Sequence, residues 1–177
     1  MGAPITERGA GGACMASVTE AKRYRQSAGL LLFRRTAEQG VEVLLGHMGG
    51  PLWAGRDAGG WAIPKGEYGP DETPRDAARR EFTEELGVPP PEGDYLPLGD
   101  VRLSSGKLVT IWAVEADLDP ALTVPGTFTM EWPPHSGVER EFPELDRVAW
   151  FTPPIARNKL IVGQIPFLER LLALLAD

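Results

Sequence analysis

The chain has 177 residues, of which 42% are hydrophobic and 24% charged, and its formal net charge is −7. A chain of this length favours one domain that buries a core without disulfides, and Cys14, as the single cysteine, excludes a disulfide within the chain and suits the cytoplasm. The negative net charge argues against a protein that binds broadly to a nucleic-acid backbone. No apolar run approaches the ~18 residues of a membrane span. We therefore expect neither nucleic acid nor membrane as a partner.

The first part of the chain predicts a tail followed by a hairpin. Residues 1–26, rich in Gly and Ala near their start, are expected to form a flexible N-terminal tail, and residues 27–177 a single folded domain. Apolar runs at 28–33 and 41–46 predict two strands, and Gln39–Gly40 between them supplies the turn. A Gly-rich loop and a short extended stretch, Trp61 to Pro64, come next.

A helix is predicted over residues 74–86. Thr73 is a suitable N-cap, Pro74 suits the first helical position, and Asp76 stands where a capping-box acid belongs. Gly87 supplies a C-terminal stop, and the prolines that follow prevent continuation.

The rest of the chain predicts four strands and a second helix. The strands are expected at residues 101–103, 108–116, 128–132 and 148–151, with an acidic loop before the last of them. A helical spacing of apolar residues predicts an amphipathic helix that packs on the sheet, carried by Leu168, Leu171, Leu172 and Leu175. Two helices around a mixed central sheet give an α/β fold with α/β/α layers.

The predicted helix at 74–86 carries three glutamates on one arc. With about 100° between successive residues of a helix, Glu81, Glu84 and Glu85 lie together, beside an apolar stripe of Ala78, Phe82 and Leu86. Carboxylates at this spacing repel one another, and a single nearby arginine cannot neutralise them all. Divalent cations with oxygen ligands, Mg²⁺ above all, are the natural counter-charge. The alternative is an acidic face that is merely solvated.

The segment from Gly66 to Val88 resembles a known motif. Gly66, Glu72 and the run from Arg80 to Val88 match the Nudix box at every position that it defines. The resemblance implies a Nudix-like α/β/α sandwich and a hydrolase that uses two or three Mg²⁺ ions, or Mn²⁺ in their place. It also implies a small nucleotide-like substrate, and we expect it to extend over residues 27–175.

The resemblance assigns roles to box residues. Glu84 and Glu85 are expected to be the main metal ligands, and Glu81 a ligand or the base that activates water. Arg80 is expected to orient these glutamates. The Lys65 carbonyl, next to Gly66, commonly ligates a metal in the family, while the Lys65 side chain either neutralises substrate phosphate or is merely solvated. The expected catalytic set is Arg80, Glu81, Glu84 and Glu85, and the expected metal site comprises Lys65, Gly66, Glu81, Glu84 and Glu85.

Residues outside the box leave alternatives open. Some family members use a further glutamate from a loop before the last strand; Glu139, Glu141 and Glu144 are the candidates here, and a solvated acidic loop is the alternative. Trp61, which begins a pattern shared with dinucleoside-polyphosphate and diphosphoinositol hydrolases, joins Lys65, Glu141 and Glu144 as expected substrate-binding residues. Three other tryptophans either stack a base or pack in the fold; these are Trp53, Trp112 and Trp132.

The expected function is hydrolysis of a phosphoanhydride bond in a nucleoside diphosphate linked to a second group. Nucleoside or dinucleoside polyphosphates rank first as substrates, and nucleotide sugars or diphosphoinositol polyphosphates second. An alternative of another class is a catalytically silent domain that senses nucleotides. Because the glutamates of the box are all present, the sequence favours the enzyme.

Overall fold

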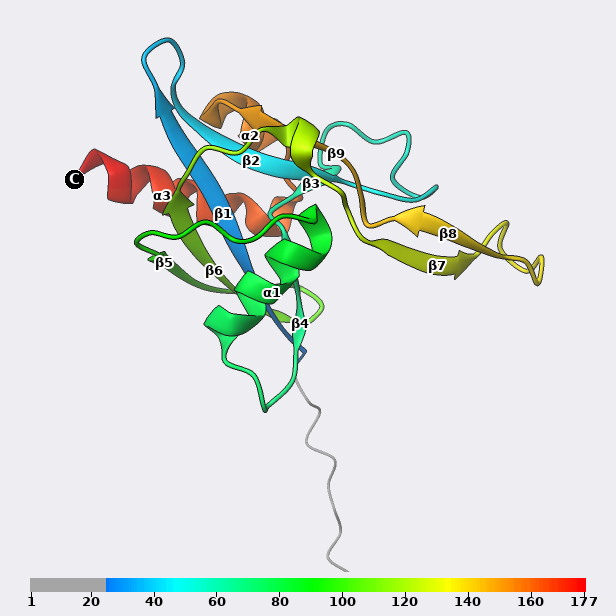
Figure 1. Ribbon diagram of the computed structural model, residues 1–177. Coiled ribbons are helices and arrows are strands. Elements are labelled where there is room, and N and C mark those ends of the chain that lie inside the picture. Colours follow the sequence, from blue (N-terminus) through cyan, green and yellow to red (C-terminus); the bar gives the residue numbers. More distant parts are fainter. Residues whose placement is uncertain (1–24) are drawn as a thin grey trace, which may run out of the picture.

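The structure is a computed structural model that describes residues 25–177 (Figure 1). The predicted tail over residues 1–26 therefore lies outside the described residues except for its last two, and Gln26 already begins the first strand. The strands are β1 Gln26–Thr36, β2 Gly40–Met48, β3 Trp61–Ala62, β4 Lys65–Tyr68, β5 Leu96–Arg102, β6 Leu108–Glu115, β7 Thr127–Glu131, β8 Glu139–Pro143 and β9 Leu145–Phe151; the helices are α1 Pro74–Leu86, α2 Pro153–Lys159 and α3 Ile165–Ala176, with 3-10 turns Pro120–Leu122 and Val162–Gln164.

The central sheet is mixed. Its order is β3-β2-β1-β6-β5, with β4 also paired to β1 and β9 to β2. The β1–β6 pair is parallel and the other pairs of this sheet are antiparallel. The middle of β1, residues 28–33, is a continuous apolar run. Such a run is expected of a strand that is covered on both faces, and here Leu31 and Phe33 belong to one core cluster while Leu30 and Leu32 belong to the other.

Helices cover both faces of this sheet. The helix α1 buries Ala77, Ala78, Phe82 and Leu86 on one side, whereas α3 buries Phe167, Leu168 and Leu171 on the other (Figure 1). The predicted α/β fold with α/β/α layers and a mixed sheet is thus confirmed. The predicted number of helices was wrong, because α2 is also present; its seven residues are too few to carry a helical apolar period.

Local sequence signals fix the ends of α1 as predicted. The Thr73 hydroxyl oxygen accepts a hydrogen bond from the Asp76 backbone N–H at 3.2 Å. At the other end Gly87 adopts a left-handed conformation with φ 69°, and its N–H donates to the Thr83 carbonyl at 2.8 Å. These caps set the two ends of α1.

A two-stranded hairpin, β7–β8, projects from the body of the molecule (Figure 1). The expectation of a loop before β9 was therefore wrong for residues 139–143, which pair with β7 from Glu131↔Glu139 to Thr127↔Pro143. The sequence did not predict this strand because most of its residues are charged and Phe142 is its single large apolar residue.

The Gly-rich loop between β2 and β3 is held by His47. This side chain is fully buried; its Nδ1 lies 2.6 Å from Asp146 Oδ1 and its Nε2 2.5 Å from the Arg56 carbonyl oxygen. One imidazole therefore links the loop to β9. Within residues 25–177, no helix is both long and apolar enough to cross a membrane.

Candidate functional site

The site forms where α1 crosses β4. A Cβ atom built on Gly66 would lie 1.9 Å from Glu81 Oε2, far inside contact distance. Only glycine at this position leaves room for the Glu81 carboxylate, which is largely buried. The helix and the strand are thus close enough for the acidic arc of α1 to lie against the β4 backbone.

Arg80 forms ion pairs with three neighbouring glutamates. Its Nε and Nη2 donate to the two carboxylate oxygens of Glu72, each at 2.8 Å. Its Nη1 donates to Glu81 at 2.6 Å and to Glu84 at 3.0 Å, and Nη2 also reaches the Glu67 carbonyl at 3.2 Å. The hydrogen bond with Glu72 is the largest of the causes that raise the pKa of Arg80, so this guanidinium stays charged.

The three glutamates on the arc of α1, Glu81, Glu84 and Glu85, form an acidic group, and Glu85 is its most deeply buried member. Its Oε2 accepts a hydrogen bond from the Lys65 backbone N–H at 3.0 Å. The pKa of Glu85 is raised to about 8, mainly by burial; the charge and the backbone N–H of Lys65 oppose this rise, and the charges of Glu144 and Glu81 contribute to it. Burial likewise lowers the pKa of the Lys65 ammonium group. Both groups are therefore in an environment that disfavours charge.

Glu144 joins this group from the other side of the site. It precedes β9, and its backbone is fixed because its N–H donates to Gly126 and its carbonyl accepts from Gly49. Burial raises the pKa of Glu144, and the charges of Glu81 and Glu84 add to that effect. Gly126 in turn donates to the carbonyl of Glu84, which ties the segment before β7 to α1.

The other two acids before β9 do not join. Glu139 and Glu141 belong to β8, where they pair with Glu131 and Thr129, and both are exposed. Of the three alternatives that the sequence leaves open, the structure brings only Glu144 to the acidic group.

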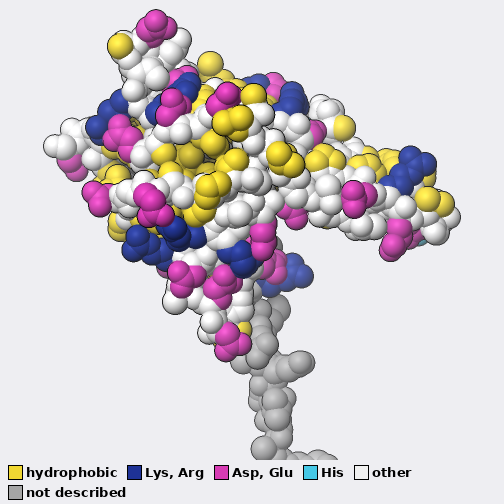
Figure 2. All heavy atoms as spheres, viewed as in Figure 1, with side chains coloured by type: hydrophobic (Ala, Val, Ile, Leu, Met, Phe, Trp, Pro, Cys, Tyr) yellow, Lys and Arg dark blue, Asp and Glu magenta, His cyan; other side chains and the backbone are white. Residues whose placement is uncertain are grey.

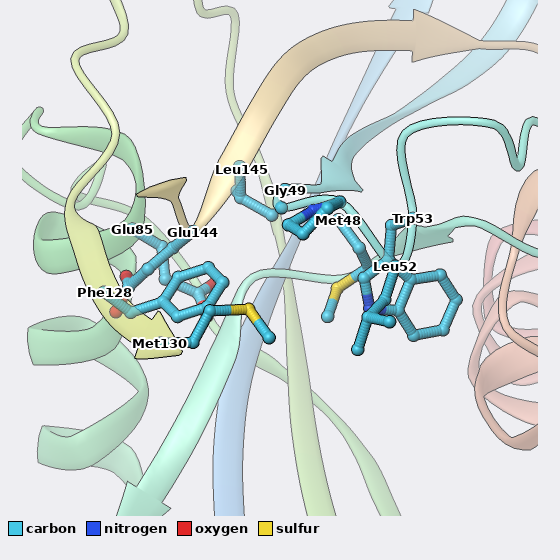
Figure 3. A pocket seen from close by; sticks show the side chains of 11 residues that line it. Met48, Gly49, Leu52, Trp53, Glu85, Phe128, Met130, Glu144 and Leu145 are labelled. Carbon is cyan, nitrogen blue, oxygen red and sulfur yellow. The ribbon is translucent and has the colours of Figure 1, made fainter. Parts of the chain in front are cut away.

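A pocket of about 370 Å³ opens beside Glu85 and Glu144 (Figure 3). Besides these two carboxylates it is lined by uncharged residues from the end of β2, the Gly-rich loop, β7 and the start of β9: Met48, Gly49, Gly50, Pro51, Leu52, Trp53, Phe128, Met130 and Leu145. Sequence reasoning missed its hairpin wall. The available signal was the alternation of apolar residues at 128 and 130 with polar residues between them.

The tryptophans take different positions. Trp61 does not reach the acidic group: it is 4% exposed, packs edge-on against His47 and Phe151, and donates its indole N–H to Asp57 at 3.0 Å. Trp112 packs against the core cluster beside α1. Trp53 alone among the tryptophans of residues 25–177 lines the pocket.

The chemistry of the acidic group suits a hard divalent cation, because such ions bind carboxylate oxygens. The pKa values of Glu81, Glu85 and Glu144 are all raised, so a bound cation would stabilise their charged forms. Within residues 25–177, however, no three acidic, histidine or cysteine side chains converge closely enough to hold an ion as they stand. Arg80 occupies oxygens of Glu81 and Glu84. Metal binding at these residues requires their side chains to turn.

Comparison with known proteins gives one family. A family model described as the NUDIX domain matches residues 23–171. RNA pyrophosphohydrolases of Pseudomonas putida and Pseudomonas fluorescens are each 45% identical over 47 residues, which is 26% of this chain and 30% of the relative. The chain therefore matches less than a third of the length of these curated relatives.

Solved structures share the fold. A C. elegans Ap4A hydrolase binary complex is 21% identical with a TM-score of 0.60, and 85% of this chain and 98% of that chain are covered. The NUDIX domain of Shewanella oneidensis NrtR, complexed with ADP ribose, is 17% identical with a TM-score of 0.60 and coverage of 88% and 91%. A Nudix hydrolase from M. smegmatis, RenU, is 27% identical with a TM-score of 0.54 and coverage of 85% on both sides.

Proposed function

The chain belongs to the Nudix family, and from that premise we propose that it is a metal-dependent hydrolase that splits a phosphoanhydride bond of a nucleotide-linked compound. The observation that carries this proposal is that Glu85 and Glu144 line one pocket, with Glu81 near enough for its charge to act on both, and that burial raises the pKa of all three carboxyl groups. Perturbed carboxylates gathered at a cleft are typical of a catalytic site.

Nudix proteins generally use divalent metal ions, and the residues of this chain that would hold them are Glu81, Glu84 and Glu85 together with the Lys65 carbonyl. A bound Mg²⁺ or Mn²⁺ ion would offset charge on the phosphate oxygens and make a water molecule more acidic. Arg80 would keep Glu72 as its partner and release oxygens of Glu81 and Glu84, because its bonds to Glu72 are bidentate. Gly66 would leave the space in which the Glu81 carboxylate turns.

Glu144 is the base in this proposal. Its raised pKa brings its proton affinity closer to the working pH, where a general base is most effective. As the water oxygen attacks phosphorus, Glu144 accepts the proton of that water, and the bond from phosphorus to the bridging oxygen breaks. The leaving group departs as a phosphate or phosphorylated compound, so the reaction needs no nucleophilic side chain.

The substrates that we rank first are nucleoside and dinucleoside polyphosphates. The fold is shared with a protein described as an Ap4A hydrolase and with a domain complexed with ADP ribose. The sequence matches RNA pyrophosphohydrolases over its most similar 47 residues. Ap4A and ADP ribose are nucleotide compounds with a phosphoanhydride bond, and a pyrophosphohydrolase cleaves such a bond. These similarities therefore support hydrolysis of a phosphoanhydride as the reaction class.

The test is a substrate screen of the full chain in ¹⁸O-labelled water, with Mg²⁺, with Mn²⁺ and with EDTA. The panel contains nucleoside triphosphates, dinucleoside polyphosphates, nucleotide sugars and diphosphoinositol polyphosphates. We expect cation-dependent cleavage with one ¹⁸O atom in a phosphate-containing product. Tight binding of a nucleotide without turnover in any cation would contradict the proposal and favour a nucleotide sensor.

A further inference from the structure

Glu144 lies at the base of the β7–β8 hairpin, between Pro143, the last residue of β8, and Leu145, the first residue of β9. The hairpin projects from the body of the molecule as an arm (Figure 2). Because a two-stranded hairpin is only marginally stable by itself in water, it cannot fix the position of Glu144 alone. The carboxylate therefore depends on how the start of β9 is held to the central sheet.

The start of β9 contains a β-bulge, two residues after Glu144. The pairing shifts by one residue between His47 and Met48 of β2, so β9 has an extra residue there, Asp146. A bulge bends its strand locally and changes where the neighbouring side chains point. The direction of the Glu144 side chain therefore depends on the geometry of this bulge.

His47 binds the side chain of the extra residue. The imidazole is fully buried; its Nδ1 lies 2.6 Å from Asp146 Oδ1, and its Nε2 lies 2.5 Å from the carbonyl oxygen of Arg56 in the Gly-rich loop. Nε of the exposed Arg147 lies 3.4 Å from the same Asp146 oxygen. One buried ring thus has two contacts, one with the bulge and one with the loop.

Both ring nitrogens of His47 face atoms that accept hydrogen bonds. A backbone carbonyl and a carboxylate only accept, and a neutral imidazole carries a single N–H. Both contacts are therefore hydrogen bonds when the ring carries two N–H groups, and the carboxylate of Asp146 then balances the charge of the ring. Because hydrogen bonds between charged groups are stronger than neutral ones, this pair holds the bulge firmly.

The backbones of β2 and β9 contact each other closely around the bulge. A Cβ atom on Gly49 would lie 1.8 Å from the Pro143 carbonyl oxygen, and the Gly49 N–H donates to the Glu144 carbonyl at 2.9 Å. A Cβ atom on Gly46 would lie 2.5 Å from Leu145 Cδ1. Since the backbones leave no space between them, a change in the bulge must move Glu144.

We propose that His47 is a positioning residue for hydrolysis, because its hydrogen bond to Asp146 holds the bulge that directs the carboxylate of Glu144 toward the acidic group. The inference rests on the proposed function, in which Glu144 is the base, and adds a residue that does not touch the substrate. Glu144 and Glu85 line one pocket, so a turn of Glu144 changes where it meets the attacking water. The competing interpretation is that the ring only holds the Gly-rich loop, through the Arg56 carbonyl.

Two substitutions of His47 separate these interpretations. The amide of asparagine lies near the position of Nδ1 and that of glutamine near Nε2, so His47→Asn keeps the bond to Asp146 and His47→Gln the bond to the Arg56 carbonyl. We expect His47→Gln to lower kcat about tenfold with KM within about threefold, because a misplaced base slows the reaction without weakening substrate binding. His47→Asn should restore kcat to within about threefold of the wild type. Equal rates in the two variants, or the opposite order, would overturn the proposal.

Asp146 gives a test that leaves the buried ring in place. Its side chain is 31% exposed, so we expect Asp146→Ala to fold, with kcat lower by about tenfold and no further loss when Glu144→Gln is added to it or precedes it. Asp57→Asn is the matched control, because this carboxylate binds Trp61 and Lys159 from the same Gly-rich loop. It should keep the wild-type kcat. Additive losses with Glu144→Gln, or an equal loss in Asp57→Asn, would show a general structural role instead.

Nitrogen-15 NMR gives a readout that needs no turnover. The chain has two histidines, and His135→Gln assigns their signals. In the full chain labelled with ¹⁵N-histidine, at about pH 7.5, where an imidazole in water is mostly neutral, both ring nitrogens of His47 should carry protons. Asp146→Ala should remove the proton from Nδ1. An unprotonated ring nitrogen in the wild type would overturn the charged pair on which the positioning role depends.

The two proposals fail in different ways. If the wild type cleaves no compound of the substrate panel, the proposed hydrolysis is wrong, and the role of His47 is wrong with it. If the wild type cleaves a substrate but His47→Gln and Asp146→Ala keep the wild-type kcat, the positioning role is wrong and the hydrolase stands.

Discussion

The carboxylate of Glu81 occupies the space that a side chain on Gly66 would fill: a Cβ atom there would lie 1.9 Å from Oε2 and 2.3 Å from Oε1. The glycine is thus required by a neighbour from α1, since φ at this position lies outside the left-handed region. Close approach of β4 and α1 follows from this pair, and it places Lys65 within hydrogen-bond distance of Glu85.

Replacement of Gly66 by alanine should therefore impair the site. In Gly66→Ala the Glu81 carboxylate must move, and we expect kcat to fall by about two orders of magnitude, with a loss of about 1–3 kcal/mol in the free energy of unfolding from overpacking. Steady-state kinetics and urea denaturation measure the two effects. Gly69→Ala is the control, because nothing lies within 4 Å of a Cβ built there; equal kinetics in the two variants would contradict the role of the Gly66–Glu81 contact.

Glu144 and Glu141 provide a test of the proposed base. Glu144→Gln should lower kcat by about 10²-fold or more and remove the acidic limb of its pH profile, since a general base contributes on that scale. Glu141→Gln should keep the wild-type rate, because Glu141 lies in β8 away from the pocket lining. A normal rate in Glu144→Gln, or loss of activity in Glu141→Gln, would show that the base has been assigned to the wrong residue.

The raised pKa of Glu85 predicts how stability depends on pH without metal. Its value of about 8 in the folded protein compares with 4.5 for the ordinary group. Between these two values the folded state retains a proton that the unfolded state releases, so the free energy of unfolding decreases as pH rises from about 5 to 8. Thermal melts in EDTA should show this decrease, and Glu85→Gln should reduce it. A variant whose melting temperature falls as steeply as that of the wild type would contradict the burial of this carboxyl group.

Arg80 should not be replaceable by lysine. Its guanidinium makes two parallel bonds to Glu72 and also binds Glu81 and Glu84, whereas an ammonium group cannot make the bidentate pair. We expect Arg80→Lys to lower kcat by about tenfold or more, with a similar loss in Glu72→Gln and no further loss in the double variant. Independent, additive losses would mean that the two residues do not act as one unit.

Much of the site was predictable because it lies on one helix. Caps at Thr73 and Gly87 fix the limits of α1, and helical spacing alone puts Glu81, Glu84 and Glu85 on one arc. The mixed sheet and its covering helices also followed from apolar runs, because buried strands and amphipathic helices leave clear local patterns.

Features that depend on distant contacts were not predictable. The choice of Glu144 over Glu139 and Glu141 depends on the pairing of β8 with β7, which the charged residues of β8 do not reveal. The strand β5 is longer than expected because it continues through Pro97 and Gly99 with a shift in register. Trp61 precedes Lys65 by four residues and yet packs in the core near α2, because β3 pairs with β2 and turns that side chain away from α1.

The most direct test of the central proposal is the Mg²⁺-dependent kcat of Glu85→Gln at saturating substrate. Glu85 is the most deeply placed member of the acidic group, and glutamine keeps its shape while removing the charge that a cation needs. We expect a rate lower than that of the wild type by about 10²-fold or more, with the fold intact and a smaller rise in melting temperature on addition of Mg²⁺. A near-normal rate with the wild-type response to Mg²⁺ would contradict it and leave the acidic arc of α1 as a solvated face.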